Sequence, residues 1–372
     1  MRQYFWQWAL AAVALSGSVV GAADQLGPDA AALKAARDKG VAFLKTSQNE
    51  DGSWTSSEAP GVTGLVTFGL LAGGATADDP AVAKALKHLE SFVQPTGGIY
   101  FAKSNHAIYE TGISMMVFAA VNKDGKYDKL LANADKYVRG LQWDESEKTD
   151  KSDPKYGGIG YGRSGDRPDL SNTVFFLEAL QAAGAKKDDP AVQKALVFLS
   201  RCQNLETEHN NTAFASKIND GGFYYTPAAG GTSQAGNNPD GGLRSYGSMT
   251  YAGLKSMVFA GLTPDDQRVQ AALTWIKKFY TVKENPGLGE QGVYYYHQMF
   301  SKALTIMKAD LFEDANGKKH DWRKELAEHL FSVQKDNGSW VNSNPRWMEG
   351  DPNLATAYVL MALKNCDPKP AK

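Results

Sequence analysis

The sequence predicts an all-α protein, folded as a closed (α/α)6 double-layer toroid with six outer and six inner helices. Segments with apolar residues on one helical face recur along the 372 residues. A loop rich in glycine and aromatic residues and then a segment that is apolar nearly all round follow each of them. A turn near the start also returns near the end, which makes the first and last helix pairs neighbours in a ring.

The one-faced segments are expected to form the outer helices. The first lies around 33–44 and the second around 82–93, with apolar residues at positions i, i+3, i+4 and i+7. DDPAVAKALKHL and DDPAVQKALVFL are near copies in which Asp caps a helix and Pro occupies its first turn. The remaining outer helices are expected at 127–141, 266–280 and 321–334.

The segments that are apolar nearly all round are expected to form the inner helices. They read VTGLVTFGLLAGG, TGISMMVFAAV, SNTVFFLEALQAAG, SMTYAGLKSMVFAGL, HQMFSKALTIMKA and LATAYVLMALKN. A helix without a polar face has to be buried on every side. Two concentric layers therefore fit better than an open solenoid, which leaves one side of each inner helix exposed and ranks second.

The repeated turn is QNEDGSW at 48–54 and QKDNGSW at 334–340, and both copies read Q-x-x-x-G-x-W. Each closes an outer helix, with Gly free to adopt a left-handed cap and Trp packing the loop onto its neighbours.

The N-terminal stretch predicts a secretory signal peptide over residues 1–23, so that 24–372 form a single exported domain, secreted or periplasmic. An uncleaved membrane anchor is the alternative; no later segment is expected to span a membrane. Without residues 1–23 the formal charge is 39 minus 41, or −2, which gives no case for nucleic acid as a partner. Cys202 and Cys366 are expected to be buried thiols, and neither a metal nor a cofactor is expected.

Q-x-x-x-G-x-W together with paired helices resembles the repeat of squalene-hopene cyclases, terpenoid cyclases and protein prenyltransferase β subunits, over about residues 30–365. The resemblance implies an α/α toroid with a deep, aromatic-lined cavity that binds isoprenoid chains. It also implies that any chemistry lies at the N-terminal ends of the inner helices.

The chemical motifs of these families are incomplete in this chain. Class II terpenoid cyclases carry Asp-x-Asp-Asp-Thr, whose middle Asp protonates an alkene. The matching segment is DLSNT, in which Asp169 keeps the first acid, Ser171 replaces the proton donor and Asn172 replaces the third acid. Asn172 also stands where prenyltransferases place a zinc-binding His, and no Asp-x-Cys pair precedes it.

Aligning the inner helices places Thr63, Thr111, Thr173, Thr250, His297 and Thr356 in one column. These residues either cap the helices or form a polar ring at the cavity mouth. The candidate catalytic residues are Asp169, Glu110 and His297, each of which also has a structural interpretation. The candidate ligand-binding residues are His106, Tyr109, Tyr161, Arg163, Asn172, Thr173, Tyr224, Arg244, Tyr296 and Trp347.

Charged residues interrupt three inner helices five positions after the column, at Glu178, Lys255 and Lys302. Charges in such helices are costly unless they are paired, so we expect Glu178 to contact Lys255. The loop 227–247 is either a mobile lid or a surface excursion.

Three functions fit the sequence. The leading one is an exported protein that binds a small-molecule or polymer ligand, isoprenoid-like or peptide, in its cavity without catalysis. The second is a divergent cyclase or prenyltransferase-like enzyme that uses Asp169 or Glu110 as its acid. The third is a carbohydrate-active enzyme, which requires two carboxylates facing each other.

Overall fold

The computed structural model describes residues 25–162 and 167–370. The signal peptide expected over residues 1–23 and the candidate Arg163 therefore lie outside the described residues. Within the described part of the chain, no helix has both the length and the apolar character needed to cross a bilayer. Cys202 and Cys366 are buried free thiols, as the sequence predicts.

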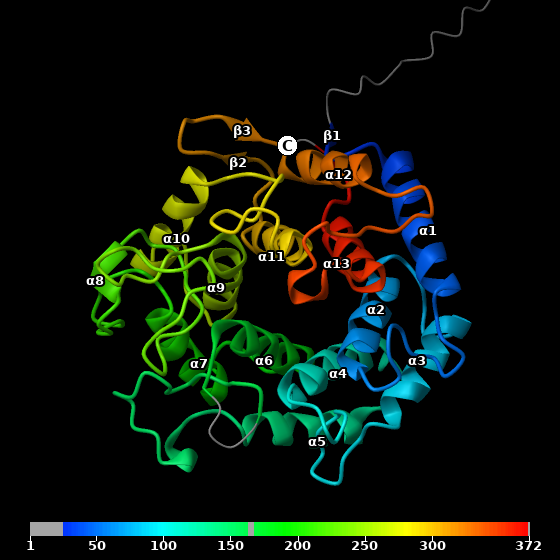
Figure 1. Ribbon diagram of the computed structural model, residues 1–372, viewed down its shortest axis with the longest axis horizontal. Coiled ribbons are helices and arrows are strands. Elements are labelled where there is room, and N and C mark those ends of the chain that lie inside the picture. The colour runs from blue at the N-terminus through cyan, green and yellow to red at the C-terminus, as the bar shows by residue number, and fades with distance from the viewer. Residues whose placement is uncertain (1–24, 163–166, 371–372) are drawn as a thin grey trace, which may run out of the picture.

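Six helices form an outer layer (Figure 1). An Asp side chain caps five of them at the N-terminus and accepts a hydrogen bond from a backbone N–H group of the first turn. These helices are α1 (Ala30–Thr46), α3 (Pro80–Glu90), α5 (Asp128–Arg139), α7 (Pro190–Arg201), α10 (Gln267–Lys278) and α12 (Trp322–Ser332).

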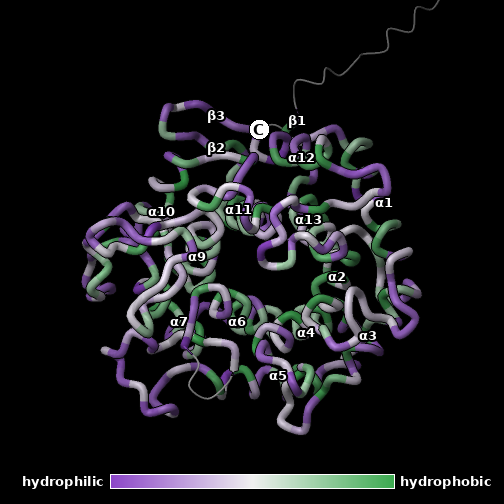
Figure 2. Tube along the Cα trace, in the orientation of Figure 1, coloured by the Kyte–Doolittle hydropathy of each residue, from purple (hydrophilic) through white to green (hydrophobic). Residues whose placement is uncertain are grey.

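A second set of six helices surrounds the centre of the molecule (Figure 1). Most of their residues are buried, because they pack against the outer helices on one side and against each other on the other (Figure 2). They are α2 (Pro60–Ala72), α4 (Ala107–Val121), α6 (Leu170–Ala182), α9 (Gly247–Phe259), α11 (Val293–Ile306) and α13 (Pro352–Lys364).

The inner helices close into a ring. Each packs against the next along the chain, and α13 packs against α2, where Gly69 lies so near Ala357 that a side chain would not fit. The two ends of the described chain also meet, because strand β1 (Gln25–Leu26) pairs antiparallel with β4 (Lys369–Pro370). The first and last helix pairs are thus neighbours, as the repeated turn predicts, and the open solenoid is ruled out.

The remaining elements are short and lie in the connections. They are the α-helix α8 (Ala215–Ile218), the 3-10 helices η2 (Glu145–Glu147) and η3 (Arg346–Met348), and a hairpin of β2 (Phe312–Glu313) with β3 (Lys319–His320). The protein is therefore mostly helical rather than strictly all-α.

The glutamine of the repeated turn joins neighbouring repeats. The side-chain amide of Gln48 donates to the carbonyl of Gly52 in its own turn and, at 2.8 Å, to that of Ala81 in the first turn of the next outer helix. Gln334 does the same across the closure of the ring and donates to the carbonyl of Ala36 at 3.0 Å. This explains why the same turn is needed at both ends of the chain.

Two further glutamines occupy the same position but lack the recognisable motif. Gln142 donates to the carbonyls of Gly157 and Ala191, at 2.8 and 3.0 Å. Gln203 likewise bonds its own glycine turn and the next outer helix. Long loops separate these glutamines from their glycines, so the motif is preserved in space although it is lost in the sequence.

Candidate functional site

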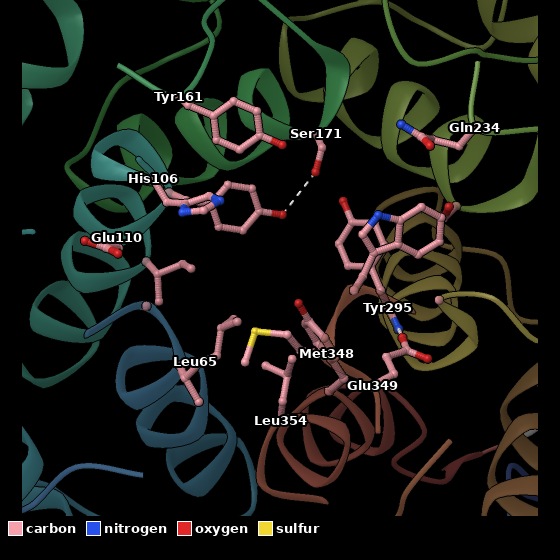
Figure 3. Close-up of a pocket in the computed structure, with 18 of the residues that line it drawn as sticks. Leu65, His106, Glu110, Tyr161, Ser171, Gln234, Tyr295, Met348, Glu349 and Leu354 are labelled. Atoms are coloured by element: carbon pink, nitrogen blue, oxygen red, sulfur yellow. Dashed lines mark hydrogen bonds between the residues drawn. The ribbon is translucent and has the colours of Figure 1, made fainter. Parts of the chain in front are cut away.

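A cavity of about 400 Å³ lies at the N-terminal ends of the inner helices (Figure 3). Seven of its lining side chains are aromatic: Tyr109, Tyr161, Tyr225, Tyr246, Tyr295, Trp347 and Tyr358. Most of the other large lining side chains are apolar: Val62, Leu65, Ile113, Met249, Met348 and Leu354. The volume is that of a typical small-molecule site.

One residue from every inner helix lines this cavity, two positions before the aligned column. Two residues along an α-helix correspond to a rotation of about 200°, so this ring lies on the opposite face from the column. The ring consists of Gly61, Tyr109, Ser171, Ser248, Tyr295 and Leu354.

The threonine column faces the outer loops instead. The Thr111 hydroxyl accepts from the backbone N–H of Ile99 at 3.0 Å and donates to the carbonyl of Ala107 at 2.7 Å. Thr173 does the same with Ile159 and Asp169. These hydroxyls attach each entering loop to its inner helix, and Thr173 does not reach the cavity.

Glu110 lines the cavity from α4, and its carboxylate is also engaged by the fold. It accepts from the backbone N–H of Phe101 at 2.9 Å and from the hydroxyl of Ser104 at 2.6 Å. Burial raises its pKa, although both hydrogen bonds act in the opposite direction. The carboxylate fastens the loop that precedes its own helix.

Glu349 is a second carboxylate of the cavity wall, and the sequence interpretation missed it. Its side chain accepts from the backbone N–H of Tyr295 and from the amide of Asn342, both at 2.8 Å. Burial raises its pKa. Figure 3 shows it across the cavity from Glu110. It follows an irregular loop rather than lying in a helical pattern, so its sequence position gave no signal.

Asp169 lies behind the wall rather than in it. Its carboxylate caps α6 by accepting from the backbone N–H of Asn172 at 2.9 Å and from the Asn172 amide at 2.8 Å. It also interacts with the Tyr225 hydroxyl, which lies 3.1 Å from the Tyr161 hydroxyl. Burial raises the pKa of Asp169 to about 6. Tyr225 and Tyr161 therefore connect a buried acid to the cavity.

Asp169→Asn is expected to flatten part of the pH dependence of stability. Because the folded pKa, about 6, exceeds the ordinary value of 3.8, this acid contributes most below pH 3.8, and the contribution fades as the pH rises through 6. The difference amounts to about 3 kcal/mol at most. Urea unfolding at pH 4 and pH 7 checks this: the wild type should lose more stability between these values than the variant. Equal pH profiles would contradict a raised pKa.

The structure brings five of the candidate residues together at the cavity: Glu110, His106, Tyr109, Tyr161 and Trp347. The His106 and Tyr161 rings make an edge-to-face contact at 5.2 Å between centroids. The Tyr109 hydroxyl lies 3.0 Å from Ser171 Oγ, the position of the missing proton donor (Figure 3).

Other candidates lie away from the cavity. His297 is fully buried, its Nε2 lies 2.8 Å from the Val282 carbonyl, and burial lowers its pKa to about 3, so the ring is neutral. The Tyr296 hydroxyl donates to the carbonyl of Thr281, and that of Tyr224 to the carbonyl of Arg201.

Two further candidates fall outside the cavity lining for different reasons. Asn172 is buried against Asp169, so its amide serves the helix cap. Arg244 is exposed on the loop 227–247 and does not line the cavity, whereas Gln234 of the same loop does. This loop thus forms part of the rim.

The rim carries an unusual aromatic residue. Trp347 is 44% exposed although it lines the cavity, and its backbone is left-handed at φ 55°. The Arg346 guanidinium stacks on its ring at 4.3 Å from the centroid and donates to Gln234 and Gln291. An apolar ring held in a strained, exposed conformation at a cavity mouth is suited to ligand contact.

Charge and metal chemistry restrict what this cavity holds. Neither lysine nor arginine is among its described lining residues. In the described ranges, 25–162 and 167–370, no group of three or more His, Cys, Asp or Glu side chains is arranged to hold a metal ion.

No protein-family model and no curated protein matches this chain. Solved structures match nearly all of it. The type II terpene cyclase MstE from Scytonema, in complex with its substrate geranylgeranyl dihydroxybenzoate, has a TM-score of 0.57 at 15% identity, covering 90% of this chain and 97% of that one. A glycoside hydrolase family 76 mannosidase from Bacteroides thetaiotaomicron gives 0.56 at 10% identity, with coverages of 89% and 98%. At such identities these matches show the fold alone: the chain has the α/α toroid architecture of terpene cyclases, as the repeated turn predicts.

Proposed function

We propose that this protein binds an apolar, isoprenoid-like ligand in the central cavity and does not catalyse the cyclisation or prenyl transfer of the proteins it resembles. The observation that carries the proposal is a cavity wall of seven aromatic side chains whose two carboxylates already accept hydrogen bonds within the fold. Aromatic and aliphatic walls stabilise an apolar ligand by removing its surface from water.

The charge of the wall favours a ligand without phosphate. Recognition of a diphosphate requires convergent Lys and Arg side chains, and the described lining residues contain none. The two acids Glu110 and Glu349 would instead repel an anion. We therefore favour an alcohol, hydrocarbon or similar uncharged isoprenoid over a prenyl diphosphate.

The absence of a suitable acid supports binding over cyclisation. Ser171 stands where the cyclases have their proton donor, and its hydroxyl is hydrogen-bonded to Tyr109. A hydroxyl group is far too weak an acid to protonate an alkene. MstE binds a geranylgeranyl compound, which supports the capacity of this fold to hold an isoprenoid chain. We also propose export, on the pattern of residues 1–23.

A specific observation favours one enzymatic alternative. Asp169, with its pKa raised to about 6, meets Tyr225, which contacts Tyr161 at the cavity. This chain of hydroxyls could deliver a proton to a bound alkene. In that case a polyprene incubated with the protein would be converted to cyclic products, and Asp169→Asn would abolish the conversion.

Glycoside hydrolysis is less well supported. Glu110 and Glu349 do face each other across the cavity in Figure 3. Each, however, accepts two hydrogen bonds from the protein, and apolar and aromatic side chains rather than sugar-binding polar groups surround them.

The proposal is tested with farnesol and farnesyl diphosphate as probes. Radiolabelled farnesol should bind, and the diphosphate should bind at least about tenfold more weakly, because the cavity offers no cation to the phosphates. Ile113→Trp fills the cavity and should abolish farnesol binding, whereas Leu311→Trp, at an exposed position, should not. Equal binding of both probes, or farnesol binding by Ile113→Trp, would refute the proposed site. Mass spectrometry of the purified protein then identifies its natural ligand.

A further inference from the structure

A cluster of three charged side chains lies deeper in the ring. Lys255 of α9 donates to Glu178 Oε1 of α6, as the sequence predicts. Lys302 of α11 joins them, with its Nζ 3.1 and 3.0 Å from the two Glu178 oxygens. Two ammonium groups share one carboxylate, so the cluster carries a formal charge of +1.

These residues line a second cavity, of about 450 Å³, which we call the lower cavity. They lie seven residues after the ring that lines the upper cavity, which corresponds to about 10 Å along the helices. Phe175 packs between the two levels, with its ring centroid 4.3 Å from that of Tyr109 and 6.4 Å from that of Tyr295. The other large side chains of the lower cavity are mainly apolar: Phe68, Met116, Leu177, Phe259 and Ile306.

The positive charge of the lower cavity is incompletely neutralised. The Lys255 side chain is only 5% exposed, and an ammonium group has three N–H donors. Glu178 is its hydrogen-bond acceptor among the described residues, and it is the lone acid of the described cavity lining. Burial lowers the pKa of Lys255, and Glu178 only partly opposes this. A second anion would therefore be stabilised here by unused donors and by surplus charge.

We propose that the lower cavity binds the carboxylate of an amphiphilic acid, with the head group at Lys255 and Lys302 and the apolar tail along the Phe68 and Phe259 side of the cavity. The site is separate from the aromatic upper cavity and differs from it in charge. It would give the protein a second ligand class, anionic where the upper cavity favours uncharged compounds.

Dodecanoate, dodecanol and dodecyltrimethylammonium test this inference by isothermal titration calorimetry. Dodecanoate should bind the wild-type protein at least about tenfold more tightly than the other two, which share its chain but not its charge. Lys302→Met leaves a neutral Lys255–Glu178 pair and should weaken dodecanoate binding at least about tenfold, whereas Lys302→Arg and the exposed control Lys364→Met should retain it.

A second variant keeps the test independent of charge changes inside the protein. Ala119→Phe obstructs the lower cavity and should weaken dodecanoate binding as Lys302→Met does. Farnesol binding in the upper cavity should be unchanged in both variants, so the two proposals fail separately. Absence of dodecanoate binding, equal affinity for dodecanol, or full affinity in both variants would overturn the inference.

Discussion

Replacing Trp340 by Ala is expected to lower the free energy of unfolding by about 3–5 kcal/mol. The side chain is fully buried, and its indole N–H donates to the Leu330 carbonyl at the end of α12 at 2.8 Å. Its ring also packs closely over Gly40 of α1. The substitution thus leaves a cavity and an unsatisfied carbonyl at the seam where the ring closes. Urea unfolding followed by circular dichroism measures the loss.

Trp347→Ala is the matched control. This ring is 44% exposed at the rim of the upper cavity, so its removal should cost less than about 1 kcal/mol of stability. It should nevertheless weaken farnesol binding, because the ring lines that cavity. Similar losses of stability in the two variants would contradict the distinct roles assigned to the two tryptophans.

The fold could be predicted from the sequence because its determinants are local and repeated. Helical periodicity separates one-faced from fully apolar segments, and the copied turn with Gln48 and Gln334 specifies closure. The register of the inner helices was also predicted. The direction of the column was not, because threonine at a helix start fits both a cavity mouth and a bond to a loop. Thr111 and Thr250 make that bond, to the N–H groups of Ile99 and Phe223.

The missed site residues have a physical explanation. Counting two residues back from the threonine column would have identified Ser248 and Leu354 at the cavity, since a rotation of about 200° changes the face. No such rule locates Glu349 or Gln234. They lie on irregular loops whose paths depend on contacts distant in sequence, such as that of Glu349 with the backbone N–H of Tyr295.

Glu178→Ala should destabilise the protein by about 3–5 kcal/mol, because it leaves two ammonium groups in the lower cavity without their carboxylate. Replacing Glu178, Lys255 and Lys302 together by Met removes the charges as well as their pairing. That triple variant should recover most of the lost stability, since a buried ion cluster is often no more stable than apolar side chains of similar volume. Thermal and urea unfolding of both variants at neutral pH make the comparison.

The same cluster predicts acid sensitivity. Burial acts to raise the pKa of Glu178, but Lys255 and Lys302 outweigh it and lower the pKa from 4.5 to about 2. The stabilisation is therefore complete above pH 4.5 and is lost as the pH falls through 2, by about 3 kcal/mol. The triple Met variant should lack this component, so its stability should fall less than that of the wild type between pH 5 and 2. If both lose stability in parallel, the acid sensitivity originates elsewhere and the cluster does not remain ionised in the folded protein.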